Sequence, residues 1–395
     1  MGLFRGYRVV DAATLFAGPL AATLLGDHGA DVVKVEHPRG DDVRRWGGQK
    51  DGMSLWWKVI SRNKRCVAID LNRPAGQQAL RDLLVDADVL VENFRPGRME
   101  AWGLGWEELQ RLNPRLTMLR MTGFGQEGPY SGFAGFGTLA EAMSGFADIT
   151  GQPDGPPTLP PFGLADGIAG ITGAFAAAGA LLKRERTGRG ELIDVALYEP
   201  LMWILGSALV EFDQLGIVQK RSGNQSVRSS PRNTYPTRDG KWIALSASAD
   251  SIARRVLTAV GRPDLAEHPD YATNRERIRR RDEIDALIRS WSLGLDQAEA
   301  LAALRAADAA VAPIYDVSQV AADPHFRARG SVTTVDDSDL GRLTMQGVFP
   351  RIVNDPATIR STPPDAIGAD TDAVLGAAGY DPDRLEVLRR EGVIR

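Results

Sequence analysis

Short apolar runs alternate with helical patterns through the first half of the chain. The runs typical of buried strands cover residues 8–11, 31–36, 66–69, 89–91 and 116–121. Segments 18–28 and 74–85 between them are expected to be helices, and Pro74 suits a first helical turn because its missing N–H has no partner there. Strands separated by helices of about ten residues form βαβ units. The pattern therefore predicts an open α/β domain with a mostly parallel sheet.

A long helix is expected next, over residues 164–184, because the apolar stretch ends at the glycines Gly188 and Gly190. A strand at 192–196 and a further helix at about 200–215 follow it. The long helix is apolar enough to suggest a membrane span. However, it contains an aspartate and four glycines, and real spans need about 20 strongly apolar residues. We therefore expect a helix buried in a protein core and no membrane segment.

The composition then shifts. Residues 219–238 are polar and lack periodicity, which indicates a linker or an active-site loop. Residues 239–322 contain one strand-like run, 242–245, and several helical stretches, enough for a small second domain. The rest of the chain has strand-like runs at 332–335 and 343–345 before two short terminal helices.

Composition narrows the class of protein. The 395 residues are 43% hydrophobic and 25% charged, with a formal net charge of −4, as in an ordinary soluble globular protein. This charge argues against a protein built mainly to bind nucleic acid. Cys66 is the only cysteine, so a disulfide framework and a thiolate metal cluster are excluded. The N-terminal residues have no apolar secretion signal, and we expect a cytoplasmic protein.

Four features that can mark catalytic or cofactor sites are absent or incomplete in this sequence. Residues 123–128 form a G-x-G-x-x-G directly after a strand, but Pro129 continues the loop where a dinucleotide site needs a helix. The four histidines have no partner at metal-ligand spacing, so we expect no metal. No Gly-x-Ser-x-Gly elbow is present, which argues against a Ser-His-Asp hydrolase. Cys66 begins an apolar strand, where a buried structural thiol is the common case.

Two basic loops follow predicted strands. Arg39 lies after one strand, and Arg95 and Arg98 lie after another. Ligands bind beyond the carboxyl ends of strands in open parallel sheets, and arginine suits a polyphosphate. A solvated surface charge explains either loop taken alone, so both interpretations stay open.

Asp166 lies near the start of the long helix, in the sequence Gly-Leu-Ala-Asp-Gly. Its position alone favours a helix cap or a complement to the helix dipole. The functional interpretation is that the same dipole keeps the carboxylate ionised, while neighbouring glycines leave room for a bulky thioester. A carboxylate nucleophile is established covalent chemistry.

Seven short motifs, in order along nearly the whole chain, carry a family resemblance. They are FAGP at 16–19, VKVE at 33–36, NKR at 63–65, VENFRPG at 91–97, DG at 166–167, TGRG at 187–190 and DP at 323–324. Together they resemble the class III CoA-transferases, a family that includes formyl-CoA transferase, carnitine CoA-transferase and alpha-methylacyl-CoA racemase.

The resemblance implies a site and a mechanism. Asp166 would attack a donor thioester to give a mixed anhydride, and would then carry CoA as an aspartyl thioester. Coenzyme A, entering as acyl-CoA, would lie along Phe16, Ala17, Arg39, Ile69, Asp70, Leu71, Asn72, Asn93, Phe94, Arg95 and Arg98. Arg39 and Arg95 would contact phosphates, residues 69–72 would flank the adenine, and the 123–128 loop would border the acyl group.

The sequence departs from the family at three positions. Ala101 stands where relatives often have a basic CoA contact. Gly137 stands where formyl-CoA transferase has a functional glutamate, which argues against formate–oxalate exchange. Residues 135–138, Gly-Phe-Gly-Thr, lack the histidine that the racemase branch pairs with its aspartate for two-base proton transfer.

The resemblance also implies the architecture. A large Rossmann-like domain would comprise residues 1–218 and 323–395, a linker 219–238, and a smaller α+β domain 239–322, in an interlocked homodimer. We therefore expect a CoA-transferase that moves CoA from an acyl-CoA to a carboxylic acid. An acyl-CoA racemase or isomerase on the same fold is the first alternative. A non-catalytic CoA-binding protein, with Asp166 as a cap, is the second.

Overall fold

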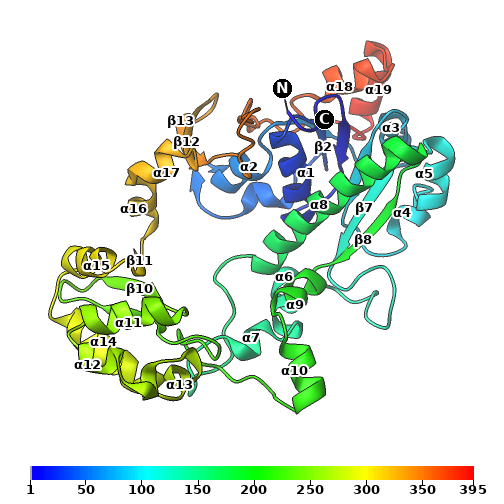
Figure 1. The fold of residues 1–395 in the computed structure, drawn as a ribbon. Coiled ribbons are helices and arrows are strands. Elements are labelled where there is room, and N and C mark those ends of the chain that lie inside the picture. Colours follow the sequence, from blue (N-terminus) through cyan, green and yellow to red (C-terminus); the bar gives the residue numbers. More distant parts are fainter. Residues whose placement is uncertain (1) are drawn as a thin grey trace. The chain divides into compact units, whose positions relative to one another are not determined.

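The computed structural model describes residues 2–395 (Figure 1). The chain forms two compact units. The first comprises residues up to 146 together with 159–209 and 324–395, and the second comprises 147–158 and 210–323.

A six-stranded parallel sheet is the centre of the first unit. Its order is β5-β2-β1-β6-β7-β8. The strands are β1 (Arg8–Asp11), β2 (Asp31–Glu36), β5 (Lys64–Ala68), β6 (Val89–Glu92), β7 (Thr117–Thr122) and β8 (Leu192–Ala196). The prediction of an α/β fold with a parallel sheet is confirmed.

Both faces of this sheet are buried at its central strands β1 and β6, which explains why these strands contain consecutive apolar residues. Val9 and Val91 belong to one core with helices α1 (Ala17–Asp27) and α8 (Leu164–Thr187). Val10 and Leu90 belong to the other core. Its helices include α3 (Pro74–Leu84), α5 (Trp106–Leu112), α18 (Thr371–Ala377) and α19 (Pro382–Arg390). Successive strand side chains point to opposite faces, so neighbouring valines serve different cores.

Helices α1 and α8 lie side by side (Figure 1). A Cβ at Gly170 would be 2.9 Å from the Ala17 carbonyl oxygen, so glycine is what permits this close approach. The opposite side of α8 is exposed in the single chain at Ile171, Phe175 and Leu182. By length and composition alone, α8 could cross a membrane, with 44% of its apolar window buried; core helices of soluble proteins pass the same test.

The first unit contains further short elements. They are the 3-10 helix η1 (Asp42–Arg45), β3 (Gln49–Lys50), β4 (Met53–Ser54), α2 (Leu55–Ile60), α4 (Arg98–Ala101), α6 (Gly137–Met143), α9 (Tyr198–Ile204), α17 (Pro324–Ala328), β12 (Val332–Asp337) and β13 (Gly341–Gln346). The last two strands include the strand-like runs expected at 332–335 and 343–345, and they pair as an antiparallel hairpin.

The second unit has a three-stranded antiparallel sheet in the order β11-β10-β9. Its strands are β9 (Arg232–Pro236), β10 (Trp242–Ser246) and β11 (Ala310–Pro313). The helices are α11 (Asp250–Ala259), α12 (Pro263–Ala266), η2 (Pro269–Tyr271), α13 (Asn274–Arg279), α14 (Arg281–Leu293), α15 (Gln297–Ala306) and α16 (Val317–Ala322). Helix α7 (Phe146–Ile149) begins at the last residue of the first unit, and α10 (Ala208–Leu215) crosses the boundary between the units.

Two expectations about secondary structure were wrong. Only β10 was expected in the second unit, so β9 and β11 were both missed. β9 is polar, ends in proline and lies within the stretch interpreted as irregular, and β11 has only four residues. The single helix expected at about 200–215 is two helices, α9 and α10, with Gly206 between them at a φ of +73°. That left-handed conformation stops a helix at little cost only for glycine.

Candidate active site

The loops that follow β5, β2, β1 and β6 meet at one edge of the sheet. These four strands are neighbours and parallel, so their carboxyl ends point the same way. This is where open α/β sheets bind ligands.

A cavity of about 190 Å³ lies at this edge and contains Asp166 in its wall. The predicted contact residues on its lining are Phe16, Ala17, Asn93, Phe94 and Arg95. The fold thus brings the aspartate of α8 to the loops after β1 and β6.

A second cavity of about 200 Å³ is lined by another group of the predicted residues: Ile69, Leu71, Asn72, Phe94 and Arg98. Thr14 and Phe94 line both cavities. The two cavities therefore adjoin, one at the aspartate and the other at the loop after β5.

Among the predicted CoA contacts, Asp70 and Arg98 are engaged by other protein groups, and Arg39 lies outside both cavities. Asp70 accepts hydrogen bonds from the backbone and side-chain nitrogens of Asn72, each at 3.0 Å, and so shapes the loop. Arg98 donates to Asn72 Oδ1 at 2.6 Å and covers the Trp102 ring. Arg39 is exposed and lines neither cavity.

Two arginines at this edge have free guanidinium groups. Within residues 2–395, no hydrogen bond or ion pair occupies the side chain of Arg39 or Arg95. An arginine without a carboxylate partner is available for an anionic ligand.

Asp166 is the third residue of α8, after the N-cap Gly163, which has no side chain to cap the helix. Burial, followed by the charge of Glu141, raises the pKa of Asp166 to about 6. The helix dipole acts in the opposite direction, and burial outweighs it in setting this pKa.

Glycine surrounds the Asp166 carboxylate. A Cβ at Gly137 would lie 1.9 Å from Asp166 Oδ2, and one at Gly163 would lie 3.3 Å from it. The Phe16 ring packs on Gly163, where a Cβ would be 3.0 Å from it. The carboxylate therefore occupies this position because Gly137 lacks a side chain, and a side chain at Gly163 would make a further tight contact.

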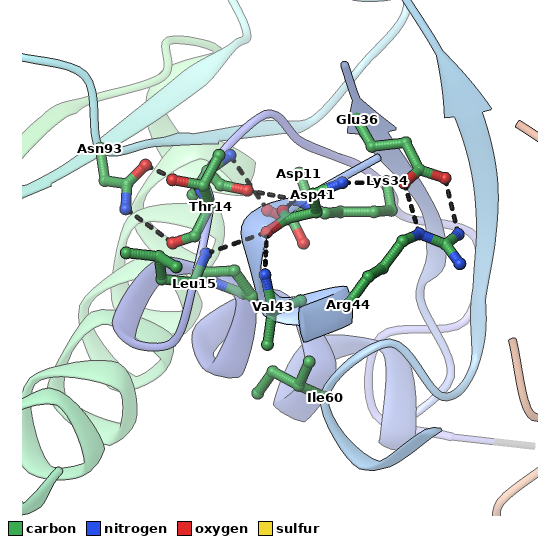
Figure 2. A network of polar contacts seen from close by, with 12 residues as sticks. Asp11, Thr14, Leu15, Lys34, Glu36, Asp41, Val43, Arg44, Ile60 and Asn93 are labelled. Carbon is green, nitrogen blue, oxygen red and sulfur yellow. Dashed lines mark hydrogen bonds and ion pairs between the residues drawn. The ribbon is translucent and has the colours of Figure 1, made fainter. Parts of the chain in front are cut away.

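A buried network of charges fixes the loop after β1 (Figure 2). Lys34 Nζ lies 2.8 Å from Asp41 Oδ2, and both side chains are inaccessible to solvent. Asp41 Oδ1 accepts from the amides of Val43, at 3.0 Å, and Leu15, at 3.5 Å. Leu15 has a φ of +68°, which costs about 1–3 kcal/mol in a residue other than glycine. The Asp41 acceptor helps to hold this strained residue in the cavity wall.

The same loop has further anchors. Lys34 donates to the Ala13 carbonyl. Asn93 accepts from the Thr14 amide at 2.9 Å and donates to the Thr14 carbonyl at 2.8 Å. Burial opposes the charge on Lys34, yet the carboxylates of Asp11 and Asp41 raise its pKa above the ordinary value. The loop is thus held by charged groups that stay ionised.

The loop after β7 forms the aromatic part of the cavity wall, through Phe124, Phe133 and Phe136. No helix begins at residue 128, so the prediction that 123–128 is a loop and not a dinucleotide motif is confirmed. Tyr130 and Phe133 stack with ring centroids 5.4 Å apart.

Sequence reasoning missed Glu141, Lys34 and Asp41. Lys34 had a detectable signal, a charged residue between two valines of a strand. Glu141 had none, because its proximity to Asp166 depends on the packing of α6 on α8.

The described residues 2–395 contain no group of three or more histidine, cysteine, aspartate or glutamate side chains placed to hold a metal ion. Cys66 is buried, and burial raises the pKa of its thiol to about 12. It is a structural thiol.

A family model described as CoA-transferase family III matches residues 4–371. The chain belongs to this family. The resemblance drawn from the motifs is confirmed, and the protein is a class III CoA-transferase.

Relatives match this transferase over nearly its whole length. Succinyl-CoA–D-citramalate CoA-transferase of Chloroflexus aurantiacus is 40% identical over 98% of this chain and 97% of its own. The beta subunit of succinyl-CoA–L-malate CoA-transferase from the same organism is also 40% identical, with the same coverage. A crystal structure of a CaiB/BaiF family protein from Brucella suis is 31% identical, has a TM-score of 0.83, and is matched over 95% of this chain and 99% of its own.

Proposed function

We propose that this transferase moves CoA from a dicarboxylic acyl-CoA, succinyl-CoA in the first instance, to a second small carboxylic acid, with Asp166 as the covalent nucleophile. The observation that carries the proposal is the half-buried Asp166 carboxylate on the wall of a cavity at the loop edge of the sheet. It is the only acidic side chain among the residues that line this cavity.

The transfer proceeds through two kinds of acyl-enzyme bond. An Asp166 oxygen attacks the donor carbonyl carbon, the C–S bond breaks, and CoA leaves as a thiolate from a mixed anhydride. The thiolate then attacks the aspartyl carbonyl of the anhydride and expels the donor acid as a carboxylate. An acceptor carboxylate attacks the carbonyl of the resulting aspartyl thioester, which expels CoA thiolate and forms a second mixed anhydride. The thiolate then attacks the acceptor carbonyl of that anhydride and expels the Asp166 carboxylate. Asp166 is regenerated, with no net proton, water or electron consumed.

The two adjoining cavities accommodate different parts of CoA in this proposal. The thioester lies beside Asp166, and the adenine lies in the cavity lined by Ile69, Leu71 and Asn72. The free guanidinium groups of Arg39 and Arg95 contact the phosphates. A phosphate gains bidentate hydrogen bonds from a guanidinium without breaking an existing ion pair.

The names of the relatives support a dicarboxylic donor. Both of the 40% identical proteins are named for succinyl-CoA, and a relative from Agrobacterium fabrum, 36% identical over 82% of this chain, is named succinate–glutarate CoA-transferase. Screening succinyl-CoA against a panel of dicarboxylic and hydroxydicarboxylic acids, with acyl-CoA products separated by chromatography, tests this choice. Transfer only from monocarboxylic acyl-CoA donors would contradict it.

Mass spectrometry tests the covalent step directly. During turnover, the intact protein should gain the mass of CoA less one water, hydroxylamine should discharge the adduct, and peptide mapping should place it on Asp166. Asp166→Asn changes the side-chain volume very little and removes the nucleophile, so it should fold, bind CoA and form no adduct. Substantial transferase activity in Asp166→Asn, without deamidation back to aspartate, would refute the mechanism.

The racemase alternative needs a second acid-base group opposite Asp166. The residues that line the cavity offer Phe136 where that branch has histidine, and Arg95 is the only other charged side chain among them. A 2-methylacyl-CoA incubated in deuterated water should therefore gain no label at its α-carbon. Rapid incorporation that depends on Asp166 would favour the racemase.

We also propose that the transferase is a homodimer. The apolar side chains Phe175 and Trp203 are 78% and 82% exposed in the single chain. A relative is named by alpha and beta subunits, which is consistent with an assembly. Analytical ultracentrifugation should give twice the chain mass at micromolar concentration, and a monomer there would contradict the proposal.

A further inference from the structure

Helix α6 presents two residues, Gly137 and Glu141, to the first turn of α8. They are four positions apart and therefore lie on the same side of their helix. Gly137 contacts the Asp166 carboxylate, as described above. Glu141 is 2% exposed, and its Oε1 accepts the amide of Ala165 at 3.1 Å.

This hydrogen bond supplies a cap that α8 lacks. The first amides of a helix have no acceptor within the helix and are commonly satisfied by the side chain of the N-cap residue. The N-cap of α8 is Gly163, which cannot provide one. Glu141 reaches this turn from another helix and bonds the amide immediately before Asp166.

We propose that Glu141 is a positioning residue of the transferase: by accepting the Ala165 amide it holds the first turn of α8 so that the Asp166 carboxylate faces the cavity. The inference rests on the proposed role of Asp166 as nucleophile.

The charge of Glu141 also affects the pKa of Asp166, which can be measured. The charge of Glu141 is the second cause, after burial, of the raised pKa of Asp166. The other charged side chain among the residues lining the cavity is Arg95, on the loop after β6. The segments 14–17 and 121–136 contribute only uncharged side chains to the lining. A carboxylate of higher pKa is a stronger nucleophile toward a thioester.

Glu141→Gln separates the charge from the hydrogen bond. The glutamine oxygen can still accept the Ala165 amide, so the variant should fold. Without the neighbouring charge, the acidic limb of the kcat/KM profile, expected near pH 6 in the wild type, should move down by about half a pH unit or more. Glu185→Gln, at the far end of α8, is the matched control and should leave the limb in place. An unchanged limb in Glu141→Gln, or an equal shift in Glu185→Gln, would contradict the inference.

Glu141→Asp tests the hydrogen bond instead. It keeps the charge but draws the carboxylate back by one methylene from the Ala165 amide. Adduct formation should slow about tenfold or more, because small displacements of a reacting group are costly. Adduct formation at the wild-type rate would contradict the positioning role. This test holds even if the Glu141→Gln variant does not fold.

Asp166→Asn distinguishes a failure of the proposed function from a failure of the proposed role of Glu141. If that variant is active, the proposed function fails and the pH limb does not report on Asp166. If it is inactive and forms no adduct, while both Glu141 variants match the wild type in pH limb and adduct rate, only the role of Glu141 is refuted.

Discussion

Replacing Gly137 by alanine should displace the Asp166 carboxylate while the protein stays folded. The added Cβ would lie 1.9 Å from Asp166 Oδ2 and 2.9 Å from its Cγ, whereas ordinary contacts begin at 3.4 Å. The oxygen must therefore move by 3.4 − 1.9, or about 1.5 Å. Because the atom that must yield is the free end of a side chain and not backbone, folding can tolerate the change.

The displacement of the carboxylate should instead lower the rate of CoA transfer. A misplacement of about 1 Å at a reacting group costs on the order of 10²-fold in rate. We therefore expect kcat for CoA transfer to fall about 100-fold, with CoA affinity within about twofold of the wild type. The free energy of unfolding should change by no more than about 1 kcal/mol, the scale of a glycine-to-alanine exchange in a helix.

Chromatographic assay of acyl-CoA products gives kcat, calorimetry gives CoA affinity, and chemical denaturation gives stability. Gly376→Ala in α18 is the matched control, because nothing lies within 4 Å of its added Cβ. It should leave kcat unchanged. If Gly137→Ala retained kcat within about twofold of the wild type while Asp166→Asn was inactive, the steric argument would be refuted.

Three further predictions concern other parts of the molecule. Arg39→Ala or Arg95→Ala should weaken CoA binding by about 1.5–3 kcal/mol in calorimetry, the range for a hydrogen bond to a charged group, and unchanged affinity in both would remove them from the site. Lys34→Met leaves the buried Asp41 carboxylate without its partner, so chemical denaturation should show a loss of about 3–5 kcal/mol; a loss below about 1 kcal/mol would contradict the network. Cys66, whose pKa is raised to about 12, should resist iodoacetamide at pH 8 until the protein is denatured, and native stoichiometric labelling seen by mass spectrometry would contradict its burial.

The sequence by itself determined the large sheet and the location of its loops. Strands buried on both faces must be apolar at consecutive positions, as Val9 and Val10 are, and this leaves a readable pattern. The same logic failed for β9, because a strand exposed on one side can be polar and can end in proline. The helix expected at 200–215 failed for another reason: a single glycine, Gly206, took a left-handed conformation that the helical pattern on either side does not reveal.

Which loops lie together was decided only in three dimensions. The chain order of the strands is β1, β2, β5, β6, but their order in the sheet is β5-β2-β1-β6. That order brings the loops carrying Asn72, Thr14 and Phe94 around adjoining cavities. Family motifs placed Asn72 and Phe94 near CoA, whereas the place of Thr14 was not expected. Local sequence could not bring the three loops together, because strand order depends on packing between distant segments.

The pKa and the accessibility of the Asp166 carboxylate depend most on tertiary structure. Its place near a helix start predicted a cap or a dipole-stabilised charge, and each follows from local backbone geometry alone. In the folded chain, burial and the charge of Glu141 raise its pKa, and Gly137 makes space for its carboxylate. The charge of Glu141 and the space left by Gly137 are not encoded near position 166, because both residues belong to α6, more than twenty residues earlier in the chain. The sequence thus determined that an aspartate begins this helix, and the packing of α6 on α8 decided how basic and how accessible that aspartate is.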